Sequence, residues 1–141
     1  MAIKQINPYL NFNGTADKAV QLYQSALGAK VQNIMRFGDA ATNMPVAPAD
    51  KNRVMHAVLD LGPSVIMLSD TMPNAAVGTD GNVHITLDFE DADEMATKFD
   101  ALAAGGKVTM PLQNTFWGAR FGMLTDAYGI HWMFNCEQRK G

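Results

Sequence analysis

Cysteine is almost absent from this chain of 141 residues, and the single residue of this type, Cys136, cannot form a disulfide within the chain. No run of apolar residues approaches the length of a membrane-spanning helix. The 11 basic and 14 acidic residues are spread along the chain without a basic block, and the net charge is −3. The sequence therefore predicts neither a disulfide scaffold nor a membrane protein, and it predicts no nucleic-acid partner.

Several motifs of common catalytic and nucleotide sites are also missing. No expected strand is followed by the glycine-rich turn that cradles a nucleoside cofactor, and no phosphate-binding loop is present. No serine or cysteine stands in a motif that would make it a nucleophile, and Cys136 falls among apolar positions, which indicates a small buried side chain. The first residues, MAIKQINPYL, lack the apolar stretch of a secretion signal, so we expect a cytoplasmic protein.

What the chain does contain is one internal repeat, which matters because a repeat decides the fold. The segment ALGAKVQ at 26–32 resembles AAGGKVT at 103–109. Hydrophobic residues make up 48% and charged residues 18%, as in an ordinary globular domain. We therefore expect a single domain over residues 1–141, built from two similar units at about 3–70 and about 82–137.

Each unit has the pattern of a strand, a helix and three further strands. Alternating apolar residues predict the two first strands, Ile6–Phe12 and Val83–Phe89. Apolar residues at helical spacing follow both strands. Gly28 is placed to end the first helix, and Asp91 with Glu94 forms a capping box at the start of the second. The remaining strands are expected at 30–37, 53–61 and 64–69 in the first unit and at 107–113, 119–125 and 130–136 in the second.

The segment Gly38–Asn52 is rich in alanine, proline, asparagine and aspartate, which predicts a long loop. Loops of about 15 residues are uncommon in compact domains and often close over a binding site. The segment is therefore either a lid or a plain connection between two strands.

The strand alternation separates two faces of the expected sheet. One face is apolar and packs under the helices; it carries Ile6, Leu10, Phe12, Val83, Ile85, Leu87, Phe89, Ile130, Trp132, Phe134 and Cys136. The other face mixes polar and apolar side chains; it carries Asn7, Tyr9, Asn11, Ile66, Leu68, Asp70, His84, Thr86, Asp88, His131, Met133 and Asn135. We expect an α+β fold in which two βαβββ units form a cupped mixed sheet, with the helices on its outer face and a small-molecule site inside. The alternative is a second face that is simply exposed to solvent.

Several short motifs extend this pattern over nearly the whole chain. They are NPYL at 7–10, GTADKAVQLY at 14–23, ALG at 26–28, MHA at 55–57, MLSD at 67–70, TFWG at 115–118, TDAYGIHW at 125–132 and WM at 132–133. Together they resemble the vicinal oxygen chelate superfamily, which contains glyoxalase I, bleomycin-resistance proteins and extradiol dioxygenases. Within it the chain is most similar to the PhnB-like branch, and the resemblance implies a homodimer.

The resemblance also implies a divalent metal, held by His, Glu or Gln side chains with two ligands from each unit. The corresponding positions here are Asn7, His84, Ile66 and Met133, and only His84 is an ordinary ligand for such an ion. We therefore expect no metal cofactor. The alternative is a relocated divalent site made of His84, His131 and Asp70, since two imidazoles and one carboxylate are the ligands of a facial triad.

The candidate ligand-binding residues are His84, His131, His56, Asp70, Trp117, Arg120 and Tyr9. Each has a structural alternative: the histidines make ordinary hydrogen bonds, Asp70 caps a turn, Arg120 is a solvated surface residue and Tyr9 belongs to the core. Trp117 follows Phe116 in a loop, and the two suit an apolar lid.

These features favour a PhnB-like protein that binds a small organic molecule. Two enzymatic alternatives stay open. One is a metal-dependent lyase, isomerase or dioxygenase that uses the relocated His and Asp site. The other is a metal-free enzyme in which His84 or His131 acts as a general base. The residues assign neither a ligand nor a catalytic side chain.

Overall fold

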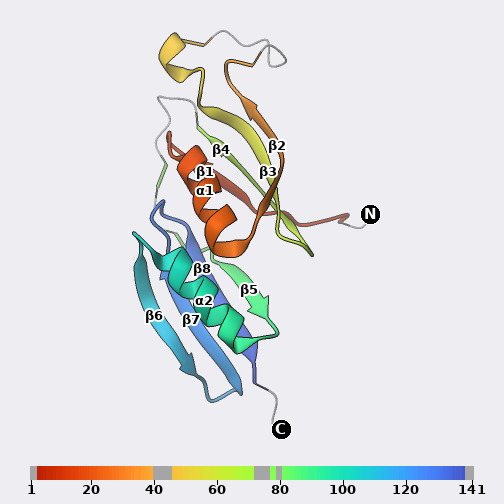
Figure 1. Cartoon of the computed structure of the whole chain (residues 1–141), viewed down its shortest axis with the longest axis vertical. Coiled ribbons are helices and arrows are strands. Elements are labelled where there is room, and N and C mark those ends of the chain that lie inside the picture. Colours follow the sequence, from red (N-terminus) through yellow and green to blue (C-terminus); the bar gives the residue numbers. More distant parts are fainter. Residues whose placement is uncertain (1–2, 40–45, 72–76, 79–80, 139–141) are drawn as a thin grey trace. The chain divides into compact units, whose positions relative to one another are not determined.

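The computed structural model describes residues 3–39, 46–71, 77–78 and 81–138. The chain divides into two compact units, Met1–Gly78 (unit 1) and Thr79–Gly141 (unit 2). Each unit contains one α-helix and four strands among its described residues. Figure 1 labels these elements. No helix in the described part of the chain is both long and apolar enough to cross a membrane.

The order of elements is the same in the two units. Unit 1 contains β1 (Tyr9–Phe12), α1 (Ala16–Leu27), β2 (Lys30–Arg36), a short 3-10 helix (Pro48–Asp50), β3 (Val54–Asp60) and β4 (Val65–Asp70). Unit 2 contains β5 (Ile85–Phe89), α2 (Ala92–Ala103), β6 (Lys107–Asn114), β7 (Ala119–Thr125) and β8 (His131–Glu137). The predicted α+β class and the two βαβββ units are therefore confirmed.

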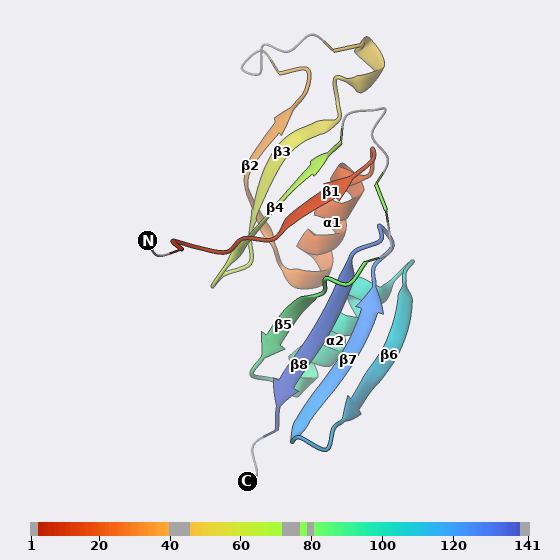
Figure 2. The same ribbon diagram turned by 180° about the vertical axis from the view of Figure 1, so that it is seen from behind.

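The strands form two separate four-stranded mixed sheets, one in each unit. Their strand orders are β1-β4-β3-β2 and β5-β8-β7-β6. The first strand of each unit runs parallel to the last, whereas the other neighbours are antiparallel. The single helix of each unit lies against one face of its sheet, as the opposite views in Figures 1 and 2 show. The other face, which we call the open face, has no helix of its own unit on it.

The helix-covered face of each sheet forms the core of its unit, because an amphipathic helix must bury its apolar stripe. The buried residues of α1 are Ala16, Ala19, Val20, Tyr23 and Ala26, and those of α2 are Met95, Phe99 and Leu102. On β8, Trp132, Phe134 and Cys136 are all buried, as the alternation predicts. Phe99 meets Phe134 edge to face with ring centroids 5.1 Å apart, so helix and sheet interlock at aromatic rings.

The ends of both helices follow local chemistry. Gly28 ends α1 with φ 73°, a left-handed conformation that glycine adopts without steric cost. Asp91 begins α2, and its carboxylate accepts hydrogen bonds from the backbone N–H groups of Asp93 and Glu94. Both assignments agree with the sequence prediction.

Two apolar residues lie outside the core that the alternation predicted for them. Ile6 is 82% exposed and Val83 is 75% exposed. The reason is that β1 begins only at Tyr9 and β5 only at Ile85, so neither residue belongs to a strand.

The predicted face of β4 is also wrong. Leu10 pairs with Leu68 and Phe12 pairs with Asp70, and paired residues of neighbouring strands share one face of a sheet. Asp70, Leu68 and Ile66 therefore point to the helix-covered side, where all three are buried. The open face of β4 carries Met67 instead.

The wrong face was predicted for β4 because the turns of two equivalent hairpins differ in length by one residue. In unit 1 the last pair before the turn is Asp60 with Val65, whereas in unit 2 it is Thr125 with His131, so the second turn is longer. Tyr9 pairs with Met67 just as Thr86 pairs with Met133. The counterpart of Met133 in unit 1 is therefore Met67 and not Ile66.

The predicted loop Gly38–Asn52 is only partly described, since residues 40–45 lie outside the described residues. At its base, the backbone N–H of Gly38 bonds to the carbonyl oxygen of Lys51 at 2.9 Å, and Phe37 bonds to Arg53 at 3.0 Å. These bonds continue the pairing of β2 with β3 beyond the strands. The proposed closing of this loop over a site stays a prediction.

Candidate functional site

The open faces carry most of the side chains that the sequence proposed for ligand contact. Side chains alternate along each strand, and the cross-strand pairs show which of them stand in one row. In unit 1 the open face carries Tyr9, Met35, His56, Val58 and Met67. In unit 2 it carries Thr86, Phe121, Met123, Thr125, His131, Met133 and Asn135. Each face is thus a mixture of thioether, aromatic, imidazole and hydroxyl groups.

In unit 1 the structure brings Tyr9 and His56 together. Their rings are 5.9 Å apart between centroids, and the Tyr9 hydroxyl lies 3.4 Å from His56 Nδ1. Tyr9 is 45% exposed, so it is not a core residue. The two side chains form one polar group on the open face, built from residues on β1 and β3.

In unit 2 the structure brings His84 and His131 together. His84 immediately precedes β5 and His131 opens β8, and the two rings are 5.3 Å apart between centroids with 44° between their planes. Thr125 Oγ1 lies 2.8 Å from His131 Nδ1, which orients the His131 ring. Both imidazoles are half-buried. They form a polar end to an open face whose middle is lined by methionine.

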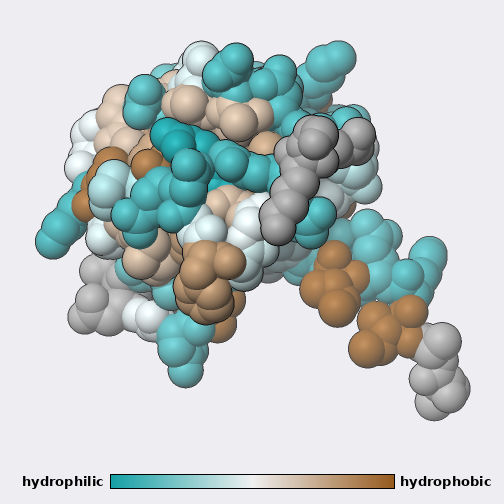
Figure 3. All heavy atoms as spheres, turned by 90° about the horizontal axis from the view of Figure 1, so that it is seen from below, coloured by the Kyte–Doolittle hydropathy of each residue, from teal (hydrophilic) through white to brown (hydrophobic). Residues whose placement is uncertain are grey.

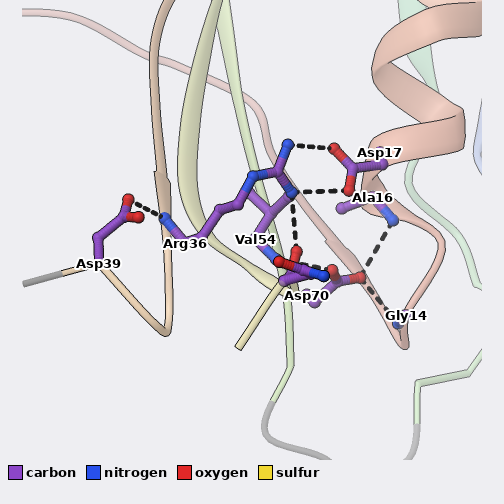
Figure 4. Close-up of polar contacts among 8 residues, drawn as sticks. Gly14, Ala16, Asp17, Arg36, Asp39, Val54 and Asp70 are labelled. Carbon is purple, nitrogen blue, oxygen red and sulfur yellow. Dashed lines mark hydrogen bonds and ion pairs between the residues drawn. The ribbon is translucent and has the colours of Figure 1, made fainter. Parts of the chain in front are cut away.

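Asp70 has a different place from the two histidines. Its carboxylate is buried on the helix-covered side of unit 1 and accepts hydrogen bonds from three backbone N–H groups: Gly14 at 2.7 Å, Ala16 at 3.0 Å and Val54 at 2.9 Å (Figure 4). Thr15, at the N-cap position of α1, makes no capping bond with its own side chain. Asp70 therefore caps α1 from a distant strand, and these contacts give it a structural role.

An ion pair beside Asp70 strengthens the same corner of unit 1. The Arg36 guanidinium donates two hydrogen bonds to the Asp17 carboxylate, at 2.7 and 2.9 Å, and one to the carbonyl oxygen of Asn52 at 2.7 Å (Figure 4). The hydrogen bond with Asp17 raises the pKa of Arg36 above its ordinary value, although partial burial opposes this effect. This fork joins α1 to β2 and to the segment before β3.

The loop residues Phe116 and Trp117 lie at the turn between β6 and β7. Phe116 is 97% exposed and Trp117 is 56% exposed, and their rings meet edge to face at 5.0 Å. The ring centroid of Trp117 also lies 5.9 Å from that of Phe121, an open-face residue of β7. In Figure 3, separate apolar groups stand out from a largely hydrophilic surface. Trp117 is thus an aromatic side chain at the edge of the open face of unit 2.

Arg120 is not on the open face. It pairs with Cys136, whose side chain is buried on the helix-covered side, and Arg120 Nη1 lies 3.4 Å from Asn114 Oδ1. Since neighbouring residues of a strand point to opposite faces, Arg120 and Phe121 are on opposite sides of β7. Arg120 is therefore separated by the sheet from His84 and His131.

Two shallow hollows lie at the end of β8 and share Asn135 and Glu137. One is completed by Asp88, Phe89 and Glu90, and the other by Trp117, Gly118, Ala119 and Gln138. Asn135 Nδ2 donates to Asp88 Oδ1 at 3.0 Å, which joins the floor of the hollows to β5. The open face of unit 2 is thus hollowed at its aromatic end.

Sequence reasoning noticed the motif of Asp126 but gave the residue no role. Asp126 is buried, and its Oδ1 accepts hydrogen bonds from the N–H groups of Tyr128 at 2.8 Å and Ile130 at 3.1 Å. Its Oδ2 accepts from Trp132 Nε1 at 2.9 Å. These bonds shape the turn that presents His131. The Asp-x-x-Gly spacing of the turn was the signal that could have identified this role.

The residues at the family's metal positions do not fit a divalent ion. With the corrected register they are Asn7, His84, Met67 and Met133, which offer one amide, one imidazole and two thioethers. Divalent ions of this kind prefer imidazole and carboxylate. The relocated triad also fails as a set, since the Asp70 carboxylate already accepts three N–H groups on the helix-covered side. Within the described ranges, no group of three His, Cys, Asp or Glu side chains could hold an ion.

Comparison with known proteins gives consistent results. The family model of the Glyoxalase/Bleomycin resistance protein/Dioxygenase superfamily matches residues 5–134. Protein YjdN of Escherichia coli is 36% identical over 143 residues, which cover 96% of this chain and 97% of YjdN. The crystal structure of protein PA1353 from Pseudomonas aeruginosa has 40% identity and a TM-score of 0.85, covering 97% of this chain and 100% of that one. A PhnB protein from Bacillus cereus has 26% identity and a TM-score of 0.79, covering 94% and 99%.

Proposed function

Because the chain belongs to the glyoxalase/bleomycin resistance/dioxygenase superfamily, we propose that it is a PhnB-like protein that binds a small organic molecule without the superfamily's divalent metal. The observation that carries the proposal is the composition of the open faces. Such a mixture of apolar lining and a few polar groups is typical of small-molecule sites.

The methionines of the open faces favour binding of an apolar or aromatic molecule. Met123 pairs with Met133 in unit 2, and Met67 occupies the equivalent place in unit 1. Methionine side chains are flexible and polarisable, so they adapt to ligands of different shape and contact aromatic rings favourably. The imidazoles of His84 and His131 would supply hydrogen bonds that orient the bound molecule.

Binding rather than divalent-metal catalysis is supported by the donor chemistry. The family uses its metal as a Lewis acid, which needs hard or borderline donors around the ion. Met133 stands where the resemblance places a carboxylate, and a thioether cannot take over that role for a divalent ion. Lewis-acid catalysis by a divalent metal is therefore not part of the proposed function.

The direct test is a ligand-observed NMR screen of the full chain against a library of small aromatic and aliphatic molecules. Compounds that bind the open face of unit 2 should lose affinity in Met123→Ala and Trp117→Ala. The control is Val108→Ala, because Val108 is a 42% exposed residue that pairs with Leu124 on the opposite side of the same sheet. A library without binders, or binders whose affinity falls equally in Val108→Ala, would contradict the proposal.

A second measurement addresses the metal directly. Elemental mass spectrometry of untagged protein, purified without chelators, should find no stoichiometric Zn, Ni, Mn or Fe. A near-stoichiometric ion that disappears in His84→Ala would instead support the metal-dependent lyase, isomerase or dioxygenase. The apoprotein should be incubated with each ion before measurement, so that loss during purification does not imitate a metal-free protein.

Two further expectations from the sequence belong to the same proposal. We expect a homodimer, which light scattering coupled to size exclusion will show as twice the mass of 15.3 kDa, and a cytoplasmic location. The enclosing of one ligand by both units also stays a prediction.

A further inference from the structure

Ser69 is a buried polar residue on the open face of unit 1. It is only 7% exposed, although the helix of unit 1 covers the opposite face. Ser69 pairs with Asn11 of β1, whereas the next residue, Asp70, points to the helix-covered side. Within the described residues, the Ser69 hydroxyl makes no hydrogen bond. A buried hydroxyl without a partner destabilises a folded protein, which points to a group from outside the chain as its partner.

The rings of Tyr9 and His56 explain why Ser69 is buried without a covering helix. Ala57 of β3 pairs with Leu68 of β4, so the residues one step further, His56 and Ser69, are neighbours on the open side. Tyr9 belongs to β1, and its hydroxyl lies 3.4 Å from His56 Nδ1. Since β4 lies between β1 and β3, this contact spans the strand that carries Ser69.

The same contact decides which hydrogen-bonding group His56 presents. When the Tyr9 hydroxyl donates to Nδ1, the proton of the neutral imidazole is on Nε2. In the part of the chain that the structure describes, Nε2 of His56 makes no hydrogen bond. The half-buried imidazole therefore presents an N–H donor on the open face, beside the hydroxyl of Ser69.

Three donors thus lie in one row across three neighbouring strands. They are the amide of Asn11 on β1, the hydroxyl of Ser69 on β4 and the imidazole of His56 on β3. Neighbouring strands are about 4.8 Å apart, and an oxygen atom about 2.8 Å from two donors on adjacent strands fits this spacing. A carboxylate has two such oxygens, which are sufficient to bind all three donors.

The acidic side chains of unit 1 that lie nearest to this row do not compete for the donors. Asp70 lies on the helix-covered side, where its carboxylate accepts three backbone N–H groups. Asp60 stands at the end of β3, beyond Val58, and its Oδ1 accepts a hydrogen bond from the N–H of Gly62 at 2.7 Å. An anionic group can therefore bind the row without repulsion from an adjacent carboxylate, whereas an ammonium group would find no carboxylate to pair with.

We propose that Asn11, Ser69 and His56 bind the carboxylate of a small organic acid. Tyr9 is a positioning residue, because it orients the His56 ring and fixes its tautomer. Met67 pairs with Tyr9 on the same face and contacts the apolar part of the acid. This inference rests on the proposed function, since it names the polar group of the bound molecule, and it uses unit 1 alone.

The test compares carboxylates with the matching amides in NMR titrations of the full chain. Benzoate and hexanoate should bind about 10-fold more tightly than benzamide and hexanamide, and they should shift the ring signals of His56. Ser69→Ala should weaken the binding of benzoate about 10-fold, because a hydrogen bond to a charged group is lost. Ser25→Ala is the matched control, since it removes an exposed hydroxyl on α1, and it should bind as the wild type does.

Two further readouts separate these roles from purely structural ones. Ser69→Ala removes a hydroxyl that makes no hydrogen bond in the described ranges, so its urea midpoint should stay equal or rise while its affinity falls. Tyr9→Phe should change the 15N signals of His56 from the Nε2–H tautomer toward a mixture of both tautomers, and it should weaken benzoate binding about 3-fold. Tyr128→Phe, in the turn before β8, is the control for the loss of a phenol hydroxyl and should change neither.

Three results would overturn the inference: equal affinity for carboxylates and amides, unshifted His56 signals, or a lower urea midpoint in Ser69→Ala. The last result would show that the hydroxyl is already satisfied in the folded protein, as by a bound water molecule. If neutral library compounds bind while carboxylates have no advantage, this inference fails and the proposed function stands. If neither carboxylates nor library compounds bind, both fail.

Discussion

The replacement of Asp70 by asparagine separates a structural carboxylate from a ligand-binding one. Asp70 is 4% exposed, and its two oxygens accept three backbone N–H groups, from Gly14, Ala16 and Val54. In Asp70→Asn the remaining oxygen can keep the two bonds of Oδ1, while the new amide NH2 faces the N–H of Val54. One buried donor then loses its acceptor, which costs about 1–3 kcal/mol of unfolding free energy.

The assay is urea unfolding of the wild type, Asp70→Asn and Asp70→Ala, followed by circular dichroism. Alanine removes all three acceptor contacts and should cost roughly twice as much as asparagine, or more. Asp39→Asn is the control, because Asp39 is an exposed residue whose Oδ2 accepts a hydrogen bond from the N–H of Arg36 at 2.7 Å; the substitution should cost less than about 1 kcal/mol of unfolding free energy.

The binding measurements complete this test. Below the unfolding transition, Asp70→Asn should bind library compounds as the wild type does, because Asp70 lies on the helix-covered side. The reasoning is refuted if Asp70→Asn is as stable as the wild type, or if the folded variant loses binding. The second result would return Asp70 to the set of ligand-binding residues that the sequence proposed.

Three further substitutions test individual contacts. Trp132→Phe removes the donor to Asp126 Oδ2 at 2.9 Å and should lower the unfolding free energy by about 1.5–3 kcal/mol in urea titrations; an unchanged midpoint would contradict the assigned bond. Gly122→Ala places a methyl group 3.0 Å from Phe99 Cε2, so overpacking should cost about 1–3 kcal/mol, measured by thermal unfolding. Trp117→Ala should change the free energy of unfolding by less than about 1 kcal/mol, since the Trp117 side chain is 56% exposed. The same substitution should remove the part of the tryptophan fluorescence that comes from a solvent-exposed indole, because Trp132 is buried.

The fold could be predicted because its signals are local. The buried Trp132, Phe134 and Cys136 alternate with the half-buried His131, Met133 and Asn135, and a period of two defines a strand with one buried face. Gly28 and Asp91 mark helix ends through chemistry that depends only on neighbouring backbone groups. The sequence grouped His84 and His131 only in the alternative of a relocated divalent site, and the structure shows their ring centroids 5.3 Å apart.

The candidate site could be predicted only in part, since several of its relations join distant residues. Tyr9 and His56 meet although 47 positions separate them in the chain. Their contact depends on β4 lying between β1 and β3, which is a property of the sheet order. The sequence proposed both residues but had no means of pairing them.

The sequence by itself thus determined the two βαβββ units, the family and the kinds of side chain that the chain presents. The tertiary structure alone decided on which face Asp70 and Arg120 lie, and that Met67 rather than Ile66 corresponds to Met133. The physical reason is the period of two along a strand: a turn longer by one residue moves every following side chain to the other face. Turn length and cross-strand pairing are settled by the packing of whole units, and no single strand encodes them.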